Sequence, residues 1–200
     1  MKRLLGLAVL VTALTGTIAG AAAAQPGPSL SLTPNQLTCF DGTTEGDGYG
    51  HCSIKHGVAI LDNVTDETGP AYSGVYLKRS NLIGKAIGNV RQLGFSYTGT
   101  PTAGSPRISL PIDTNGDGAT DDYAFISAYY CNDGAGNVDA VNDPTCTIYI
   151  GSDVYPNWAS MVGAHPTYHV AHATPFVIAD DPGTWSVFNV KLGQVLARVA

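Results

Sequence analysis

The feature that most constrains this chain is a two-residue period in its apolar segments. In residues 107–112, the side chains of Ile108, Leu110 and Ile112 alternate with Arg, Ser and Pro. Because successive side chains of a strand point to opposite faces, this pattern predicts a strand with one buried face and one solvated face. A later segment repeats the pattern, with one predicted face formed by Phe188, Val190 and Leu192.

The composition also favours strands over helices. Only two of the 16 acidic residues are Glu, whereas the chain contains 24 Gly, 12 Pro and 10 Tyr. Strong helix formers are therefore scarce, and residues typical of strands and turns are plentiful. One or two helical turns are expected at 158–162, ended by Gly163 and Pro166. The expected strands are 58–61, 74–77, 93–97, 107–112, 123–130, 146–150, 176–178 and 184–192.

These strands predict an all-β fold, a two-layer antiparallel β-sandwich or jelly roll, over residues 55–200. Residues 25–54 are expected to form an N-terminal extension with a disulfide loop. Residues 1–24 have the pattern of a signal peptide, because Lys2 and Arg3 precede an apolar run that ends in small residues. We therefore expect a secreted mature chain with no membrane insertion and a formal charge of 8 − 16 = −8.

Basic residues are too few and too dispersed to bind phosphates. Ten Lys and Arg are spread along a chain whose formal charge is −6. A nucleic acid or an anionic membrane attracts proteins that gather positive charge on one surface. The sequence therefore argues against both partners.

Four cysteines in an exported chain favour two disulfides. Of the three pairings, we prefer Cys39 with Cys52 and Cys131 with Cys146, since each bond closes a loop rich in Gly and Asp. Such loops stabilise a fold by restricting the unfolded chain. Zinc binding is the alternative, but the sequence contains no Cys-x-x-Cys motif.

Residues 113–122, Asp-Thr-Asn-Gly-Asp-Gly-Ala-Thr-Asp-Asp, form the sharpest local motif. Oxygen ligands at positions one, three and five, Gly at six, a carbonyl at seven and an acid at nine can converge on one Ca²⁺. The candidate ligands are Asp113, Asn115, Asp117, the Ala119 carbonyl, Asp121 and Asp122.

Over these ten residues the loop resembles the calcium loops of EF-hands, dockerins and thrombospondin type 3 repeats. It departs from them at position twelve, where Ala124 replaces the bidentate Glu, and strands rather than helices flank it. The resemblance implies weak binding, with a dissociation constant of roughly 10⁻⁴ to 10⁻³ M. A metal-free hairpin loop is an equal alternative, because Asn-Gly and Asp-Gly form turns by themselves.

Aromatic side chains with polar tips form a second candidate site. Tyr and Trp can stack on the apolar faces of sugar rings, while carboxylates and amides bond the hydroxyl groups. The candidates lie at predicted strand ends or in loops. They are Tyr129, Tyr130, Tyr155, Trp158 and Trp185.

From about residue 59 to 192, the order of elements resembles that of bacterial jelly-roll carbohydrate-binding modules and lectin-like domains. The resemblance is carried by the strand with Val75 and Tyr76, the 93–97 strand, the 105–110 strand that runs into the Asp-rich loop, and a closing strand at 185–190. The chain is also similar to uncharacterised secreted proteins of high-GC Gram-positive bacteria. By analogy, the resemblance implies a polysaccharide or cell-surface glycan as partner.

Signals of catalysis are weaker. His165, His169 and His172 could suit a metal, but a strand would turn the last two to opposite faces, so we expect loop histidines. The sequence lacks the motifs of serine hydrolases and zinc peptidases, and Glu, the usual raised-pKa proton donor, is scarce. Catalysis by a pair of carboxylates stays an open alternative. The candidate residues are Asp139, Asp143, Asp153, Asp180 and Asp181.

Three functions therefore remain open. The first is a secreted, non-catalytic protein that binds extracellular or cell-surface glycan. The second is a structural or protein-interaction sandwich without a small ligand. The third is a polysaccharide hydrolase or lyase, which requires two carboxylates, or a Tyr with a His or Arg, in one cleft.

Overall fold

The computed structural model describes residues 36–43, 49–64, 71–78, 81–131 and 135–194. The described helical segments are short: η2 (Ile87–Asn89), η3 (Ala128–Tyr130) and α1 (Trp158–Ala164). None of them is long and apolar enough to cross a membrane. The strands are β1 (Leu37–Thr43), β2 (Tyr49–Lys55), β3 (Val58–Val64), β4 (Ala71–Leu77), β5 (Val90–Thr98), β6 (Arg107–Asp113), β7 (Asp122–Ser127), β8 (Asn137–Asp139), β9 (Ile148–Ile150), β10 (Asp153–Tyr155), β11 (His169–Val170), β12 (Phe176–Ala179) and β13 (Gly183–Gln194).

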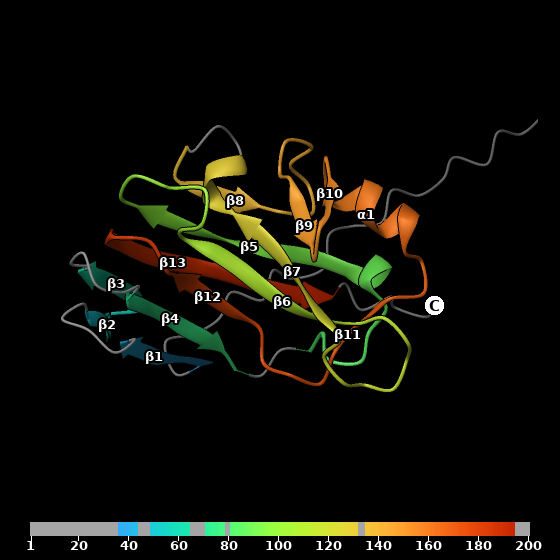
Figure 1. The fold of residues 1–200 in the computed structure, drawn as a ribbon, viewed down its shortest axis with the longest axis horizontal. Coiled ribbons are helices and arrows are strands. Elements are labelled where there is room, and N and C mark those ends of the chain that lie inside the picture. The colour runs from blue at the N-terminus through green and yellow to red at the C-terminus, as the bar shows by residue number, and fades with distance from the viewer. Residues whose placement is uncertain (1–35, 44–48, 65–70, 79–80, 132–134, 195–200) are drawn as a thin grey trace, which may run out of the picture.

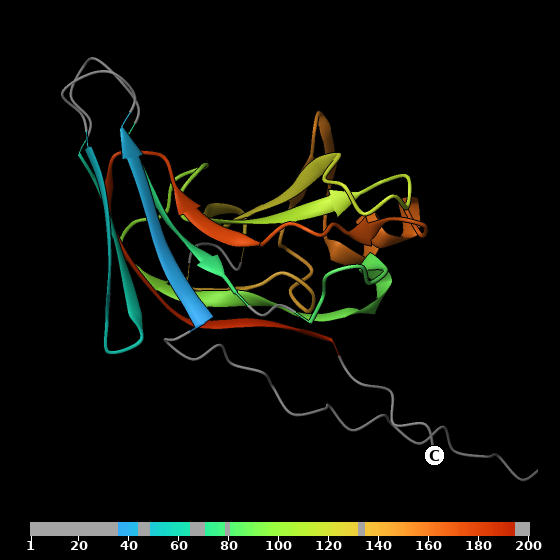
Figure 2. The same ribbon diagram turned by 90° about the horizontal axis from the view of Figure 1, so that it is seen from below.

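The strands form two antiparallel sheets that pack against each other (Figure 1). The larger sheet has the order β1-β4-β12-β6-β7-β9-β10, with β11 also paired to β6. The smaller sheet has the order β2-β3-β13-β5-β8. Figure 2 shows them as two layers. The prediction of an all-β antiparallel sandwich is confirmed.

Strand β4 alternates as a half-buried strand should. Val75 and Leu77 lie in the core, whereas Tyr72 and Tyr76 are 37% and 39% exposed. Burying an aliphatic side chain of this size stabilises the fold by about 1.5 to 3 kcal/mol. Tyr72 and Tyr76 make no such contribution to the core. Core packing therefore does not explain why these two positions carry aromatic side chains.

Strand β6 does not have the solvated face that its sequence predicts. Its Ile and Leu residues face the core as expected, but Ser109 and Pro111 on the other side are also buried. In the register, Ser109 lies between Phe176 of β12 and Phe125 of β7. The outer face of β6 is therefore covered by aromatic neighbours and not by water.

Strand β13 contains a bulge that changes which residues share a face. Asn189 has a φ of 50°, and the pairing with β5 shifts just after Phe188. A bulge adds one residue to one strand of a pair and so turns the residues beyond it to the other face. Val187, Val190 and Leu192 are consequently all buried, and the predicted common face of Phe188, Val190 and Leu192 is wrong for Phe188.

A buried polar contact joins the two sheets. Asn63 of β3, in the smaller sheet, is 3% exposed. Its Nδ2 donates to the Ala179 carbonyl of β12 at 2.7 Å, and its Oδ1 accepts from Ser73 Oγ of β4 at 2.7 Å. Because both ends of this amide are satisfied, it fixes the relative position of the sheets without leaving a buried polar group unpaired.

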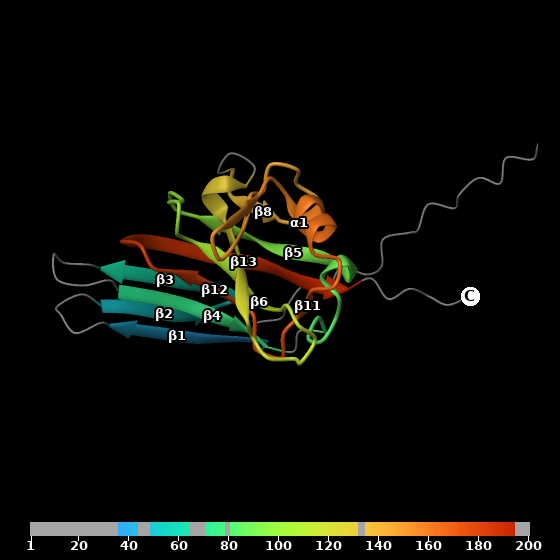
Figure 3. The ribbon, with the colours of Figure 1, turned by 45° about the vertical axis from the view of Figure 1, so that its right-hand side comes forward.

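Both predicted disulfides are confirmed, Cys39 to Cys52 and Cys131 to Cys146. The first joins β1 to β2, which are edge strands of different sheets and lie near each other at one side of the molecule (Figure 3). The expected extension at 25–54 is therefore wrong from residue 37 onward, because this segment supplies two strands of the sandwich. The signal-peptide prediction, 1–24, falls outside the described residues.

Candidate functional site

The outer side of the larger sheet carries a group of aromatic side chains that we call the aromatic face. The strand register brings them together, because Phe176 of β12 is opposite Tyr76 of β4 on one side and Ser109 of β6 on the other. Ser109 is in turn opposite Phe125 of β7. The aromatic face consists of Phe40, Tyr72, Tyr76, Tyr123, Phe125 and Phe176.

The rings of the aromatic face contact one another in a row. Ring centroids are 4.5 Å apart for Phe40 and Tyr76, 6.0 Å for Tyr76 and Phe176, 5.7 Å for Phe176 and Tyr123, and 6.0 Å for Tyr123 and Phe125. The first and last pairs are tilted by only 37° and 21°, whereas Phe176 meets Tyr76 and Tyr123 edge to face. The row thus has one tilted pair and one stacked pair, separated by the ring of Phe176 in an edge-to-face orientation.

Two glycines make room for rings that lie over the sheet. A Cβ on Gly42 would fall 2.2 Å from the ring of Tyr72, and one on Gly74 would fall 2.4 Å from the ring of Phe40. Neither glycine has a positive φ, so steric room and not backbone conformation is what these positions require. The rings of Tyr72 and Phe40 therefore lie across neighbouring strands.

The aromatic face remains accessible to solvent. Tyr72 and Tyr76 are exposed, and the other four rings are half-buried by one another. Isolated exposed apolar residues are ordinary, but contiguous apolar groups on a soluble protein mark interaction sites. The six contacting rings form one contiguous group and not a set of isolated exposed residues.

One basic side chain lies beside the rings. The guanidinium of Arg107 is 5.2 Å from the centre of the Phe125 ring, and its Nη1 also pairs with the Asp180 carboxylate and donates to the Gly104 carbonyl. The side chains of Arg107 and Asp180 are 19% and 34% exposed. The cation is therefore neutralised by a neighbour and held over an aromatic ring.

Two of the sequence-predicted ligand residues extend this surface. Tyr129, 52% exposed, and Tyr130 belong to η3 and meet edge to face with centroids 4.9 Å apart. Tyr130 also contacts Tyr149 of β9, which is opposite Phe125 in the register. Burial, followed by the neighbouring Tyr130, raises the pKa of Tyr149.

The two tryptophans predicted to bind a ligand lie inside the protein and not on its surface. Trp158 and Trp185 are 4% and 2% exposed and belong to the core. The indole Nε1 of Trp185 donates to the Thr100 carbonyl at 3.0 Å, which satisfies the only polar atom of the ring. A sugar cannot stack on either side chain in this structure, and this corrects the expectation for both.

The Asp-rich loop is organised by its own carboxylates and amide. Asp113, 3% exposed, accepts backbone N–H bonds from Asn115, Gly116 and Gly118 at 3.1, 2.7 and 2.9 Å. Asn115 Oδ1 accepts from the N–H of Asp117. Such bonds between a side chain and the backbone two residues on define a tight turn. The segment folds as a self-supporting hairpin loop between β6 and β7.

The other candidate carboxylate ligands of calcium are also hydrogen bonded. Asp117 accepts from the N–H of Ala119, Asp121 accepts from Thr114, and Asp122 accepts from the N–H of Tyr123. Within the described residues, no group of three or more His, Cys, Asp or Glu side chains is placed to hold a metal ion. Calcium binding here stays a prediction.

Asp113 titrates at lower pH than an ordinary aspartate. Burial of the carboxyl raises its pKa, but backbone hydrogen bonds from Gly116, Gly118, Asn115 and Asp117 outweigh this effect, so the pKa is lowered from 3.8. The amides favour the charged form. The folded loop therefore favours an ionised Asp113.

The three histidines do not assemble into one site. His169 and His172 line a cavity of about 240 Å³ together with Asp113, Asp117 and three glycines. His165 instead stacks on Tyr168, with ring centroids 4.2 Å apart. The expectation that His169 and His172 are loop residues facing opposite sides is wrong, because His169 belongs to strand β11 and both side chains line the same cavity.

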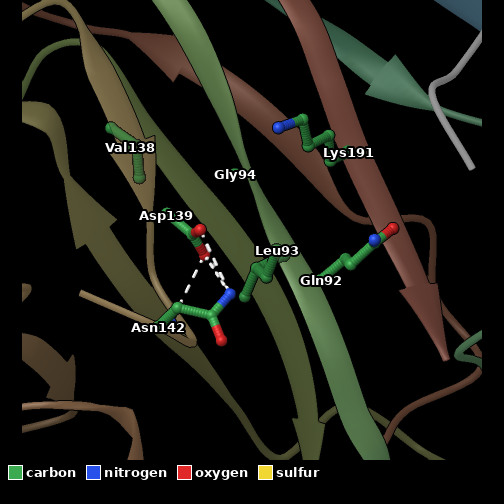
Figure 4. Close-up of a pocket in the computed structure, with 7 residues that line it drawn as sticks. All are labelled: Gln92, Leu93, Gly94, Val138, Asp139, Asn142 and Lys191. Atoms are coloured by element: carbon green, nitrogen blue, oxygen red, sulfur yellow. Dashed lines mark hydrogen bonds between the residues drawn. The ribbon is translucent and has the colours of Figure 1, made fainter. Parts of the chain in front are cut away.

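A smaller cavity lies on the outer side of the smaller sheet (Figure 4). Its volume is about 70 Å³, and its lining includes Gln92, Asp139, Asn142 and Lys191. Asn142 Nδ2 donates to both oxygens of Asp139, at 2.9 and 3.1 Å. Pockets for small ligands usually measure about 300 to 1,000 Å³, so this cavity is too small for a sugar ring.

The candidate catalytic carboxylates are already paired or hydrogen bonded. Asp180 pairs with Arg107, Asp181 accepts from Thr102, and the N–H groups of both aspartates donate to Ser105 Oγ. Asp143 accepts from Thr145 in its own loop. These carboxylates fasten loops, which is a structural use.

A Tyr and a His do meet near α1. Tyr155 Oη and His165 Nε2 are 2.5 Å apart, and Asp153 is 3.4 Å from the same hydroxyl. Burial, followed by the charge of Asp153, raises the pKa of Tyr155. Neither of the two cavities described above includes this pair. A raised pKa also makes Tyr155 a weaker source of the phenolate that a lyase needs.

Comparison with models of protein families, with curated proteins and with solved structures finds no match to this chain. The aromatic face was missed at the sequence level because its members come from four strands. Its signal is nevertheless present, since Tyr72 and Tyr76, and likewise Tyr123 and Phe125, recur at even spacing. Even spacing along a strand puts both rings on one face.

Proposed function

We propose that this chain is a secreted, non-catalytic protein that binds a polysaccharide through the aromatic face. The single observation that carries the proposal is the row of contacting rings on the outside of the larger sheet. Folding does not account for this row, because the core is complete on the opposite side of the same strands.

Sugar recognition suits the chemistry of this surface. Pyranose rings have apolar C–H faces that pack on aromatic rings, and their hydroxyl groups need polar partners nearby. The aromatic face supplies rings over the sheet, with tyrosine hydroxyls at Tyr72, Tyr76 and Tyr123. The tyrosines lose little conformational entropy on binding, because a Tyr side chain has only two rotatable bonds.

Secretion is part of the proposal. Two disulfides are typical of extracellular proteins, in agreement with the signal-like pattern at residues 1–24. Polysaccharides are abundant at cell surfaces and outside cells, so the expected location matches the expected ligand.

The test is a binding assay on the mature chain with insoluble and soluble polysaccharides, read by co-sedimentation and by retardation in native gels that contain the polymer. The double variant Tyr72→Ala/Tyr76→Ala removes the two most exposed rings. We expect it to lose roughly 100-fold in affinity, about 2.7 kcal/mol, since well-placed aromatic anchors each contribute more than 1 kcal/mol.

Phe188→Ala is the matched control, because Phe188 lies on the outer side of the smaller sheet. It should bind as wild type does. Reducing ends should not accumulate during the assay. Absence of binding to every polymer, or equal loss in the control, would contradict the proposal, and self-association lost only in the double variant would instead support the protein-interaction alternative.

A further inference from the structure

The row of rings crosses the strands of the larger sheet instead of following one of them. It begins on β1 with Phe40, passes over β4 and β12, and ends on β7 with Tyr123 and Phe125. Neighbouring strands are about 4.8 Å apart, so four steps span roughly 19 Å. A surface of this length can contact several sugar units of one chain at once.

The aromatic face is also short of available positive charge. Arg107 is the only Lys or Arg in β1, β4, β12, β6, β7 and β9. Its guanidinium is committed to Asp180 and to the face of Phe125. Of the acids in these strands, Asp113 is buried and bonded to its loop. Within these strands, a polyanion that approached would meet no Lys or Arg that is not already paired, on a protein of net charge −6.

From these two observations, and resting on the proposed function, we infer that the ligand is an uncharged polysaccharide bound in an extended conformation across the strands. The ion pair between Arg107 and Asp180 makes the face selective, because Asp180 cancels the one positive charge within these strands that would attract an acidic polymer. Rejecting the wrong ligand in this way is as much a part of specificity as attracting the right one.

The shape of the face supports binding along a chain and not at its end. A chain end is recognised by an enclosing pocket, which can surround a single sugar unit. The cavity at Asp113 and His172 and the cavity at Asp139 lie outside the row of rings. Affinity should consequently rise with the number of sugar units until the row is filled, since each added unit finds another ring.

The first experiment measures affinity of the mature protein for matched oligosaccharides by titration calorimetry and glycan array at low salt. The neutral probes are cellohexaose, xylohexaose, mannohexaose and chitohexaose, each with its disaccharide. The acidic probes are hexamers of galacturonate, of alginate and of chondroitin sulfate. We expect binding among the neutral hexamers, at least tenfold weaker binding of the matching disaccharide, and at least tenfold weaker binding of every acidic hexamer.

The second experiment tests the ion pair with Asp180→Asn. This variant keeps the size of the side chain but frees the charge of Arg107. We expect its affinity for acidic hexamers to rise at least threefold at low salt. The gain should vanish in 0.5 M NaCl, because the Debye length is then on the order of 5 Å and the charges are screened. Arg107→Met should show no such gain. If Asp180→Asn does not fold, the charge and length dependence of the wild type still decides the inference.

The outcomes separate the two proposals. Tighter binding of an acidic hexamer that is lost in Tyr72→Ala/Tyr76→Ala overturns the inference of a neutral ligand and leaves the proposed function intact. Equal affinity for a disaccharide and its hexamer overturns binding across the row. No binding to any probe, neutral or acidic, overturns the inference together with the proposed function.

Discussion

The two sheets share one core but present different outer faces. The outer face of the larger sheet carries six contacting aromatic rings. On the smaller sheet the corresponding outward positions are mostly polar, and the register places Ser53 opposite Ile60, His51 opposite Asp62, and Lys191 opposite Gly94. Both sheets bury their inward apolar residues equally well.

This difference separates what folding requires from what it leaves free. Inward positions are constrained by the core, and the outward positions of the smaller sheet show that polar residues complete such a sandwich. The rings on the larger sheet are therefore an additional property. A second difference lies in the hairpins, because β2 and β3 are joined by a two-residue turn, His56 and Gly57, whereas β6 and β7 are joined by the Asp-rich loop.

The largest expected effect comes from breaking the covalent link between the two sheets. Cys39→Ser/Cys52→Ser removes a bond that closes a loop with a sequence separation of 13. We expect the free energy of unfolding to fall by about 3 kcal/mol, because the unfolded chain regains the entropy of that loop. Urea unfolding followed by circular dichroism measures this loss. An unchanged midpoint would mean that other contacts hold β1 and β2 together.

Moving a ring without deleting it sharpens the comparison further. In Gly42→Ala, the new methyl group occupies the place of the Tyr72 ring, whose far end can move aside. We expect polysaccharide affinity to fall about tenfold, or 1.4 kcal/mol, since the ring leaves the row. The thermal midpoint should change little. A Gly163→Ala variant is the control, because its Cβ meets nothing within 4 Å.

Calcium addition tests the second difference, in which the Asp-rich loop joins β6 and β7 whereas a two-residue turn joins β2 and β3. With a dissociation constant of about 1 mM, 10 mM Ca²⁺ should stabilise the protein by roughly 1.4 kcal/mol relative to chelator, because the ion binds only the folded loop. For a chain of this size, that raises the melting temperature by about 3 to 6 °C. The variant Asp113→Ala/Asp117→Ala should lose the shift. An equal shift in wild type and variant would show that calcium acts elsewhere.

The smallest effect is present at neutral pH and is lost only in acidic solution. The pKa of Asp113 is lowered from 3.8 in the folded protein, so its ionised form stabilises the fold above that pH, and this stabilisation is lost as the pH falls through the lower folded value. Asp113→Asn should therefore melt below wild type at pH 6, and the difference should narrow as the pH falls below 3.8. A difference that stays constant would mean that charge is not what the loop amides require.

The sequence indicated most of the sandwich because burial has a period of two. It missed β1 and β2, since Gly, Asp, Thr and Cys in these segments give no alternation, and their place depends on pairing with β4 and β3. It misassigned Phe188, because only the bulge at Asn189 reverses the faces. The disulfides were predictable, since the two loop lengths left a clear preference.

The site was harder to predict than the fold. Whether an aromatic residue is exposed depends on which side of its strand or helix it lies. The polarity of its neighbours in the sequence does not reveal that side. Trp158 and Trp185 sit among polar and turn residues yet lie in the core. Phe40 and Phe176 are 136 positions apart in the chain and are brought together only by β4 and its two neighbours.

The bond between Cys39 and Cys52 also determines how the molecule carries mechanical load. Cys39 directly precedes Phe40, the first ring of the row, and is the third residue of β1. Tension applied through the chain before β1 can peel only Leu37 and Thr38 from β4 before the pull passes through sulfur into β2 and the smaller sheet. If the protein were bound to a polymer through its rings and pulled at its N-terminal chain, it would thus stay bound until both sheets, and not one strand, unfolded.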